Sequence, residues 1–289
     1  MLLHRLMMRV NYLLQLPVSV WFILASRRIH PAYDMGLWRK LRLGARMFAN
    51  TMVIPTASSY KSHLAMALKI LEAAPEHGGV VVECGAWKGG STANLSLVCE
   101  IAGRTLKVFD SFEGLPTGVP GDRQAANYRT GDYHGKLEEV KANVRRHGCI
   151  GVCEFIPGWF EHTLPELDDP VLLAYVDVDL EASLDTCVRR LWPNLVDSGF
   201  IFIDEYLVLD YCALFWSERW WRENFDRTPP GLIGAGVGLA LGEYFIGPWN
   251  ELDDHPTQHP NGAAYTRKSF SGHWAFYPGP NVVPDRSGA

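Results

Sequence analysis

A glycine-rich turn between an apolar run and a helical pattern constrains the fold of this chain more than any other feature. Val80–Val82 predicts a buried strand, Glu83 lies at its end, and a turn over 85–91 leads into a helical pattern over 92–102. In open α/β sheets, such a turn lets a ligand approach the backbone beside a helix N-terminus. The sequence therefore predicts a cofactor site made of Glu83, Gly85, Ala86, Trp87, Gly89 and Ser91.

The glycine spacing indicates which cofactor binds. Gly85-x-x-x-Gly89-Gly90 lacks the G-x-G-x-x-G turn that holds a pyrophosphate, so a cofactor without phosphates is favoured. S-Adenosylmethionine (SAM) has ribose hydroxyls and a zwitterionic amino-acid end. Glu83 and the turn offer a carboxylate and backbone amides to the amino-acid end. Asp110, at a second acidic strand end 27 residues after Glu83, is placed to bind the ribose.

Strand patterns alternate with helical patterns along the middle of the chain. Strands are expected over 80–82, 105–109, 152–157, 171–176 and 200–203, and helices over 60–73, 92–102, 135–147 and 183–195, the last of them terminated by Gly199. This alternation predicts an α/β fold with a Rossmann-like, doubly wound and mostly parallel sheet, whose ligands bind at the carboxyl ends of the strands. We expect a helical N-terminal extension over 1–50 and the sheet domain over 51–289.

Acidic residues follow two of the predicted strands. Asp177 and Asp179 come after the apolar run 171–176, and Asp204 and Glu205 come after 200–203. On neighbouring parallel strands these side chains would share one edge of the sheet, where unpaired carboxylates repel one another. A hard divalent cation such as Mg²⁺ relieves that repulsion and prefers oxygen ligands. Taken singly, Asp179 is better explained as a helix N-cap and Glu205 as a salt-bridge partner, whereas the two acidic strand ends together favour a metal site.

Such a cation would also help a carboxylate to deprotonate a hydroxyl group. An alcohol has a pKa near that of water, about 15.7, whereas an aspartic acid has a pKa of about 3.9, so an aspartate alone is a weak base for this task. Coordination to a cation makes the hydroxyl more acidic and orients its oxygen. Asp179 lies beside the predicted cluster, in a position to accept the proton.

Six short motifs together resemble the macrocin O-methyltransferase (TylF/MycF-like) family. They are Glu83–Ser91, Phe109–Pro116, Pro157–Phe160, Thr163–Pro165, Asp177–Glu181 and Gly199–Tyr206, in this order along the chain. The resemblance runs from about Thr51 to Tyr206, and Asp-Ser-Phe-Glu-Gly-Leu-Pro over 110–116 is its most specific part.

The resemblance implies a class I, SAM- and Mg²⁺-dependent enzyme that methylates sugar hydroxyls. It implies metal ligands at Asp177, Asp204 and Glu205, a catalytic base at Asp179, and contacts to SAM from Glu83, Gly85, Asp110 and Ser111, with Gly158 and Trp159 near the adenine. The chain departs from the family in two ways. Asp204-Glu205-Tyr206 stands where Asp-Asp-Tyr is more frequent, and the tail after Tyr206 does not align.

Charge and cysteine usage limit the partners and the compartment. A net charge of −5 and a sequence pI near 6.1 give no broad basic field, which excludes nucleic acid as an expected partner and favours a small-molecule hydroxyl acceptor, above all a sugar. The six cysteines form no zinc-type spacing and are expected to be reduced, which favours a cytoplasmic protein.

The N-terminal segment and the acceptor leave alternatives open. The apolar run 13–24 follows Arg5 and Arg9 and is too short to span a bilayer. It is interpreted, in order of preference, as a docked or partner-binding helix, a membrane-surface helix or a cleaved signal, so self-association, a homo-oligomer and membrane association all stay open. For the function, catechol-type O-methylation and a non-catalytic SAM-binding relative are the alternatives.

Overall fold

The computed structural model describes Val10, 16–24, 26–118, Asp122, 124–204, 209–237, 242–246 and 263–268. Its strands are β1 (Val80–Cys84), β2 (Leu106–Asp110), β3 (Cys153–Pro157), β4 (Val171–Val176), β5 (Leu195–Ile203), β6 (Leu232–Val237), β7 (Gly242–Ile246) and β8 (Ala263–Arg267). Its α-helices are α2 (Leu16–Leu24), α3 (Leu37–Val53), α4 (Tyr60–Glu72), α5 (Gly90–Ala102), α6 (Leu137–His147), α7 (Phe160–Thr163), α8 (Glu181–Asn194), α9 (Leu209–Ala213) and α10 (Glu218–Phe225).

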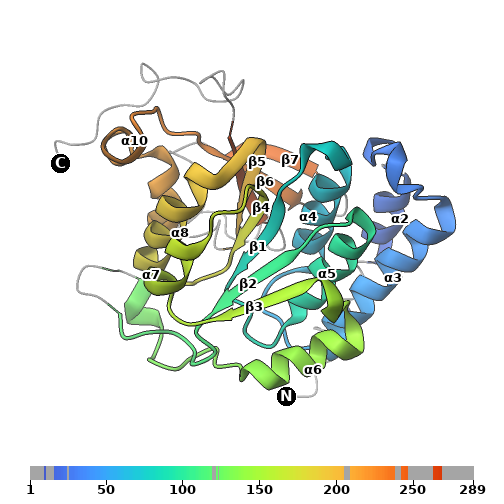
Figure 1. Ribbon diagram of the computed structural model, residues 1–289, viewed down its shortest axis with the longest axis horizontal. Helices are drawn as coiled ribbons and strands as arrows, with labels where there is room; N and C mark the ends of the chain where they lie inside the picture. The colour runs from blue at the N-terminus through green and yellow to red at the C-terminus, as the bar shows by residue number, and fades with distance from the viewer. Residues whose placement is uncertain are drawn as a thin grey trace.

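The strands form one twisted sheet in the order β3-β2-β1-β4-β5-β8-β6-β7, with helices on both faces (Figure 1). The strands from β3 to β5 in this order pair in parallel, whereas β8 pairs antiparallel with both β5 and β6. The order follows the doubly wound arrangement 3-2-1-4-5-6, with β8 inserted between β5 and β6. The predicted α/β fold with a mostly parallel sheet is confirmed.

Two hydrophobic clusters fill the space between the sheet and its helices. Because successive side chains of a strand point to opposite faces, Val81 and Tyr175 join the cluster under α3, α4, α5 and α6, while Val82 and Val176 join the cluster under α7, α8 and α10. Residues of β4 are buried on both faces, as their unbroken apolar run predicts. This rigid centre fixes the carboxyl ends of β1, β2 and β4, where the candidate site lies.

The end of α8 differs from the prediction. Gly199 does not terminate the helix: α8 ends at Asn194, β5 starts at Leu195, and Gly199 lies inside this strand. The register against β4 shifts here, and Ser198 has a φ of 60°. Lys268 instead caps α8, since its Nζ donates to the carbonyl oxygens of Trp192, Pro193 and Leu195 at 2.8–3.1 Å. A residue far away in the sequence therefore supplies the cap.

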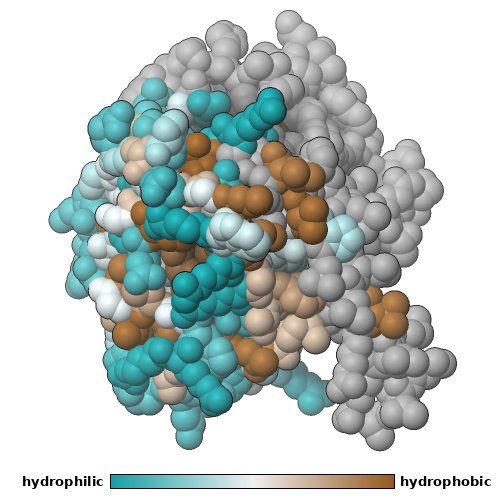
Figure 2. Space-filling view, turned by 90° about the vertical axis from the view of Figure 1, so that its right-hand side faces the viewer, coloured by the Kyte–Doolittle hydropathy of each residue, from teal (hydrophilic) through white to brown (hydrophobic). Residues whose placement is uncertain are grey.

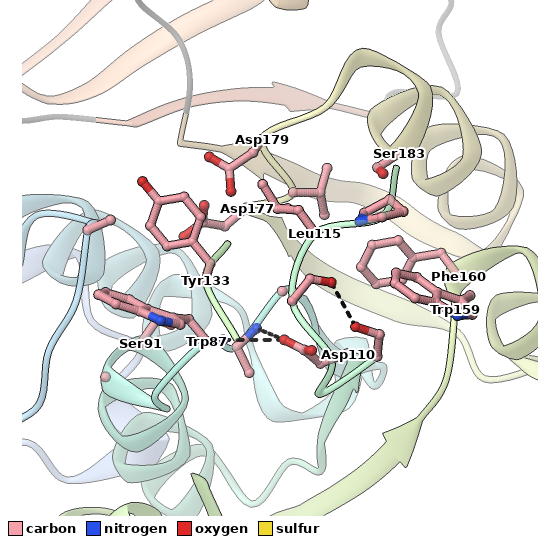
Figure 3. A pocket seen from close by; sticks show the side chains of 18 of the residues that line it. Trp87, Ser91, Asp110, Leu115, Tyr133, Trp159, Phe160, Asp177, Asp179 and Ser183 are labelled. Carbon is pink, nitrogen blue, oxygen red and sulfur yellow. Dashed lines mark hydrogen bonds between the residues drawn. The ribbon is translucent and has the colours of Figure 1, made fainter. Parts of the chain in front are cut away.

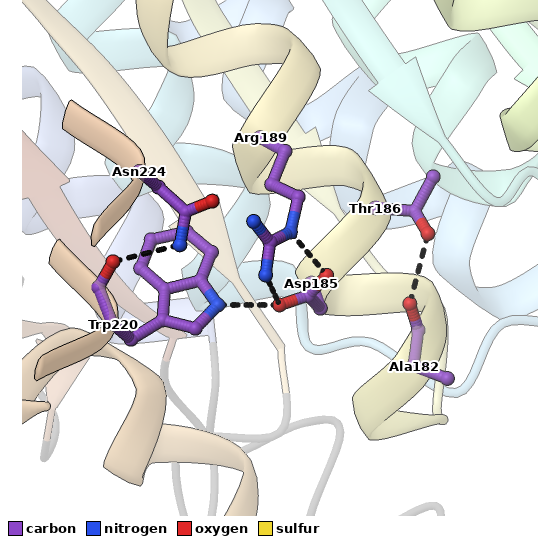
Figure 4. Close-up of polar contacts among 6 residues, drawn as sticks. All are labelled: Ala182, Asp185, Thr186, Arg189, Trp220 and Asn224. Carbon is purple, nitrogen blue, oxygen red and sulfur yellow. Dashed lines mark hydrogen bonds and ion pairs between the residues drawn. The ribbon is translucent and has the colours of Figure 1, made fainter.

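Helix α10 is fastened to α8 by a small polar cluster (Figure 4). Arg189 donates two hydrogen bonds to Asp185, and Trp220 Nε1 donates to the same carboxylate. The Arg189 guanidinium also lies 4.9 Å from the centroid of the Trp220 ring. On the inner side of α10, Trp221 is fully buried and lies edge-on against Trp192. Trp220 and Trp221 thus anchor α10 to the sheet domain from two sides of the helix.

Helix α3 is an integral part of this domain. Asn50 Nδ2 donates to Asn94 Oδ1 on α5 at 2.9 Å, and Asn94 Nδ2 lies 2.9 Å from His63 Nδ1 on α4. Since the amide is the donor, the neutral His63 carries its proton on Nε2, 2.8 Å from Ser58 Oγ. The predicted boundary after residue 50 falls inside α3, which continues to Val53. In the described part of the chain, no helix is long and apolar enough to cross a membrane.

Candidate active site

A pocket opens at the carboxyl edge of the sheet, where the chain leaves β1, β2, β3 and β4 (Figure 3). Its wall contains the predicted cofactor residues Gly85, Ala86, Trp87, Ser91, Asp110, Ser111, Gly158 and Trp159, and the predicted acids Asp177 and Asp179. Three further predicted residues, Glu83, Gly89 and Asp204, do not line it. Glu205 lies outside the described residues. The structure therefore brings most of the predicted site into one cavity.

The turn after β1 is held in a conformation that only its sequence permits. Gly85 has a φ of 89°, and a Cβ atom there would stand 1.9 Å from the backbone oxygen of Asp177. Trp87 has a φ of 44° although it is not a glycine, and its ring lies 5.3 Å from that of Tyr133 in an edge-to-face arrangement. The chain thus approaches the end of β4 more closely than any side chain at Gly85 would allow.

Asp110 fixes this turn from the end of β2. One of its carboxylate oxygens accepts hydrogen bonds from the backbone amides of Ala86 (2.6 Å) and Trp87 (3.3 Å), and the other accepts one from Phe112 (2.6 Å). Burial raises the pKa of Asp110, and these amides act against that shift. A carboxylate has about four lone-pair positions, so at least one stays open to a ligand hydroxyl. Contact with a ribose remains a prediction.

Glu83 is fully buried in β1, two residues before Gly85. Burial raises the pKa of its carboxyl group to about 7, while the neighbouring Ser91 and Thr92 partly oppose this shift. Neither carboxylate oxygen reaches a partner with hydrogen-bond geometry in the described part of the chain. An unsatisfied buried carboxylate is costly, and a cationic group arriving above the turn would lower that cost.

The predicted acids at the ends of β4 and β5 do lie side by side. Val176 pairs with Ile203, so Asp177 and Asp204 follow in register. The hydroxyl of Tyr175 lies 3.0 Å from a carboxylate oxygen of each. A phenol carries one hydrogen and donates it to one of two acceptors at a time. Burial raises the pKa of Asp204 to about 7, Tyr175 opposes this shift, and the nearby Asp179 adds to it.

Asp179 points into the pocket from the turn after β4. Its φ is 59°, and burial raises its pKa to about 6, with Tyr128 opposing the shift and Asp132 adding to it. The interpretation of Asp179 as a helix N-cap is wrong. Leu180 occupies the N-cap position of α8 without a side-chain hydrogen bond, and the amide of Ala182 is instead bound by Asp122. The Asp179 side chain lines the cavity instead (Figure 3).

Residues with positive φ gather around this cavity. Trp87 and Asp179 are two of them. Two more residues have a positive φ: Tyr133 in the pocket wall (56°) and Phe112, which follows the lining residue Ser111 (57°). Backbone strain of this kind is frequent at ligand sites and persists where the surrounding structure holds the residue in place. Among the described residues, no three His, Cys, Asp or Glu side chains form a ready-made metal cluster.

Sequence reasoning missed several residues of the site. The pocket wall also contains Pro55–Ala57, Tyr133, Phe160 and Ser183. Pro55–Ala57 follows α3 and reaches the site because Gly90 leaves room for Thr56: a Cβ at Gly90 would stand 2.9 Å from the Thr56 Cβ. Tyr175 was hidden in an apolar strand pattern. Of these, only Phe160, inside the motif Pro157–Phe160, carried a sequence signal.

Comparisons with known proteins agree with this geometry. The profile of the macrocin-O-methyltransferase (TylF) family matches residues 45–227. A tetracenomycin-type rhamnosyl 4'-O-methyltransferase from Streptomyces olivaceus is 37% identical over 46% of this chain and 55% of its own length. Demethyldecarbamoylnovobiocin O-methyltransferase from Streptomyces niveus is 31% identical over 51% of this chain and 60% of its own length.

Among solved structures, the O-methyltransferase NovP superposes with a TM-score of 0.50 and 26% sequence identity, over 66% of this chain and 72% of NovP. The chain spans little more than half the length of the curated relatives it matches. The family profile covers well over half of this chain and includes every candidate site residue named above. The chain belongs to the macrocin-O-methyltransferase (TylF) family, as its motifs predicted.

Proposed function

We propose that this chain is a SAM-dependent O-methyltransferase that acts on a hydroxyl group of a sugar or a glycosylated small molecule. The observation that carries the proposal is one cavity that joins the strained turn after β1, the Asp110 carboxylate and the acids after β4. Membership of the family and the names of the two curated relatives support the same reaction.

The pocket suits the separate chemical groups of SAM. Gly85 and Ala86 line the pocket where the amino-acid end of the cofactor would lie, and their amides already donate to the Phe109 carbonyl and the Asp110 carboxylate. Glu83 is buried two residues before Gly85 on this side of the pocket. Asp110 offers its remaining lone pair to the ribose. The rings of Trp159 and Phe160 form an apolar wall for the adenine, next to Gly158. SAM would thereby extend across the ends of β1, β2 and β3.

Asp179 is the proposed general base. A carboxyl group with a pKa near 6 is a better proton acceptor than an ordinary aspartate, and its turn holds it over the cavity. Asp177 and Asp204, and Glu205 from outside the described residues, are the proposed ligands of a divalent cation. The carboxylates of Asp177 and Asp204 both lie 3.0 Å from the Tyr175 hydroxyl, so they are close enough to bind one cation. Such a cation would be one that prefers oxygen ligands. Such an ion would make the acceptor hydroxyl more acidic.

Transfer of an isotopically labelled methyl group from SAM to a panel of glycosylated acceptors tests the reaction. Asp179→Asn should lower kcat by about 10²- to 10⁴-fold without weakening SAM binding. Asp168→Asn is the matched control, because Asp168 is exposed and outside the pocket. An Asp179→Asn enzyme as fast as the control would remove Asp179 as the base.

Titration of SAM by calorimetry, with Mg²⁺ and after chelation, separates the remaining alternatives. Metal assistance predicts that chelation abolishes methyl transfer while SAM still binds. SAM binding without transfer to any acceptor, with or without Mg²⁺, would favour the non-catalytic relative. Transfer restricted to phenolic acceptors would favour catechol-type methylation.

A further inference from the structure

Exposed apolar side chains are concentrated in the N-terminal helices. In the described part of the chain, every large hydrophobic residue counted as exposed lies between Val10 and Val53, apart from the pocket residue Tyr133. Trp38 is 81% exposed, Leu24 67% and Val53 61%. Single exposed apolar residues are ordinary, but a group of them on one pair of packed helices marks an interaction surface.

The same region is strongly basic, whereas the rest of the chain is acidic. Residues 1–50 contain eight Lys or Arg residues and a single acidic residue, Asp34, so they carry +7. Because the whole chain carries −5, the remaining residues carry −12. Such asymmetry between two parts of one chain indicates a negatively charged partner for the basic part.

Both properties meet on the outer face of α3. Leu43 and Met47 are buried against the domain, whereas Trp38, Arg42 and Met52 recur on the exposed side with helical spacing. Figure 2 looks at this side of the molecule and shows hydrophobic residues gathered among strongly hydrophilic ones. A helix that presents apolar and basic side chains together to solvent has the composition of a membrane-surface helix.

Some of these cations are engaged within the protein, and others face outwards. Arg39 donates to the carbonyl oxygen of Asp34, Arg46 to that of Gly148, and Arg28 pairs with Glu72. Arg27 and Arg42 are exposed and pair with no acidic side chain among the described residues. Arg27 follows the exposed Leu24 by three residues and Arg42 follows the exposed Trp38 by four, so each positive charge lies near an exposed apolar side chain.

Helix α2 adds to this surface. Its nine residues, Leu16–Leu24, contain no charged side chain, and they pack along α3 (Figure 1). A helix that is apolar all round is usually buried on every side, yet Val20 and Leu24 are 52% and 67% exposed. Arg27 follows Leu24 by three residues and adds an exposed positive charge to this apolar edge.

We propose that the outer face of α3, together with Val20, Leu24 and Arg27, docks onto a lipid bilayer that contains anionic lipids. The apolar side chains enter the boundary between headgroups and acyl chains, where tryptophan is favoured, and the arginines contact lipid phosphates. A second copy of the chain is the less suitable occupant, since a two-fold contact would bring the exposed Arg27 and Arg42 of both copies into one interface. Helix α3 ends two residues before Pro55 in the pocket wall, so docking would hold the pocket near the lipid surface.

Flotation of the full chain with vesicles tests this proposal. We expect binding to vesicles of phosphatidylcholine with phosphatidylglycerol, little binding to phosphatidylcholine alone, and weaker binding as salt concentration rises. Trp38→Ser and Arg42→Glu should each lower vesicle affinity by about tenfold or more. Arg219→Glu is the matched control, because Arg219 is also exposed but lies on α10, on the other side of the molecule in Figure 1.

The outcomes are distinct. Circular dichroism and SAM binding show that the variants stay folded, since Trp38 and Arg42 contact neither the core nor the pocket. Absence of binding to either vesicle, or equal binding by the parent chain, Trp38→Ser and Arg42→Glu, would overturn the proposal. So would light scattering that finds a dimer which Trp38→Ser dissociates, because a second copy would then cover this face.

Discussion

Replacement of Gly85 by alanine tests whether the close approach of β1 and β4 governs both stability and the pocket. At a φ of 89°, an alanine loses about 1–2 kcal/mol relative to glycine through backbone strain alone. Its Cβ would also stand 1.9 Å from the Asp177 backbone oxygen, where no flexible side chain can give way. Overpacking of this kind costs about 1–3 kcal/mol. We therefore expect Gly85→Ala to lower the free energy of unfolding by about 2–5 kcal/mol.

Gly131 provides the matched control. Its φ is 85°, and a Cβ there would meet no atom within 4 Å, so Gly131→Ala carries the strain without the clash. Urea unfolding followed by tryptophan fluorescence and circular dichroism gives both free energies. Gly131→Ala should cost about 1–2 kcal/mol, and the difference between the two variants measures the clash. A Gly85→Ala chain no less stable than Gly131→Ala would refute the reasoning, as would unchanged SAM binding by Gly85→Ala.

Three further predictions concern two buried titratable groups and one partly buried hydrogen bond. Burial lowers the pKa of His63 from 6.5 to about 4, so the stability that its neutral form provides is full above pH 6.5. The free energy of unfolding should fall by up to about 3 kcal/mol as the pH drops to 4. Urea unfolding of His63→Gln should lack this loss. Burial raises the pKa of Glu83 from 4.5 to about 7, so its contribution to stability is full below pH 4.5 and is lost as the pH rises through 7. The stability of Glu83→Gln relative to the parent chain should therefore grow by up to about 3 kcal/mol from pH 4.5 to 8, and a constant difference would contradict this. Trp220→Phe removes the indole donor to Asp185 but leaves the ion pair between Asp185 and Arg189, and it should lower the free energy of unfolding by about 1 kcal/mol. A variant as stable as the parent chain would show that this hydrogen bond contributes nothing.

Local sequence was sufficient for the five parallel strands of the sheet and for most of the lining of the candidate pocket, but not for the antiparallel strands β6, β7 and β8. An apolar run of six residues fits a strand buried on both faces, and glycines placed after a strand permit a close backbone approach wherever the strand lies. Carboxylates that follow parallel strands must share an edge, which is why Asp177 and Asp204 were placed together correctly. These inferences depend on residues close together in the chain and on the fixed geometry of parallel pairing.

Contacts between distant segments were decided by the tertiary structure alone. Asp122 binds the amide of Ala182 in the first turn of α8, Lys268 closes the other end of that helix, and Tyr175 joins the two acidic strand ends. Nothing in the local pattern around these residues specifies their partners, because a side chain's hydrogen bonds depend on which segments the packed core brings within about 3 Å of it. Sequence by itself determined which elements form and which chemistry they carry. Packing decided which of these groups meet, since burial and hydrogen bonding act between neighbours in space.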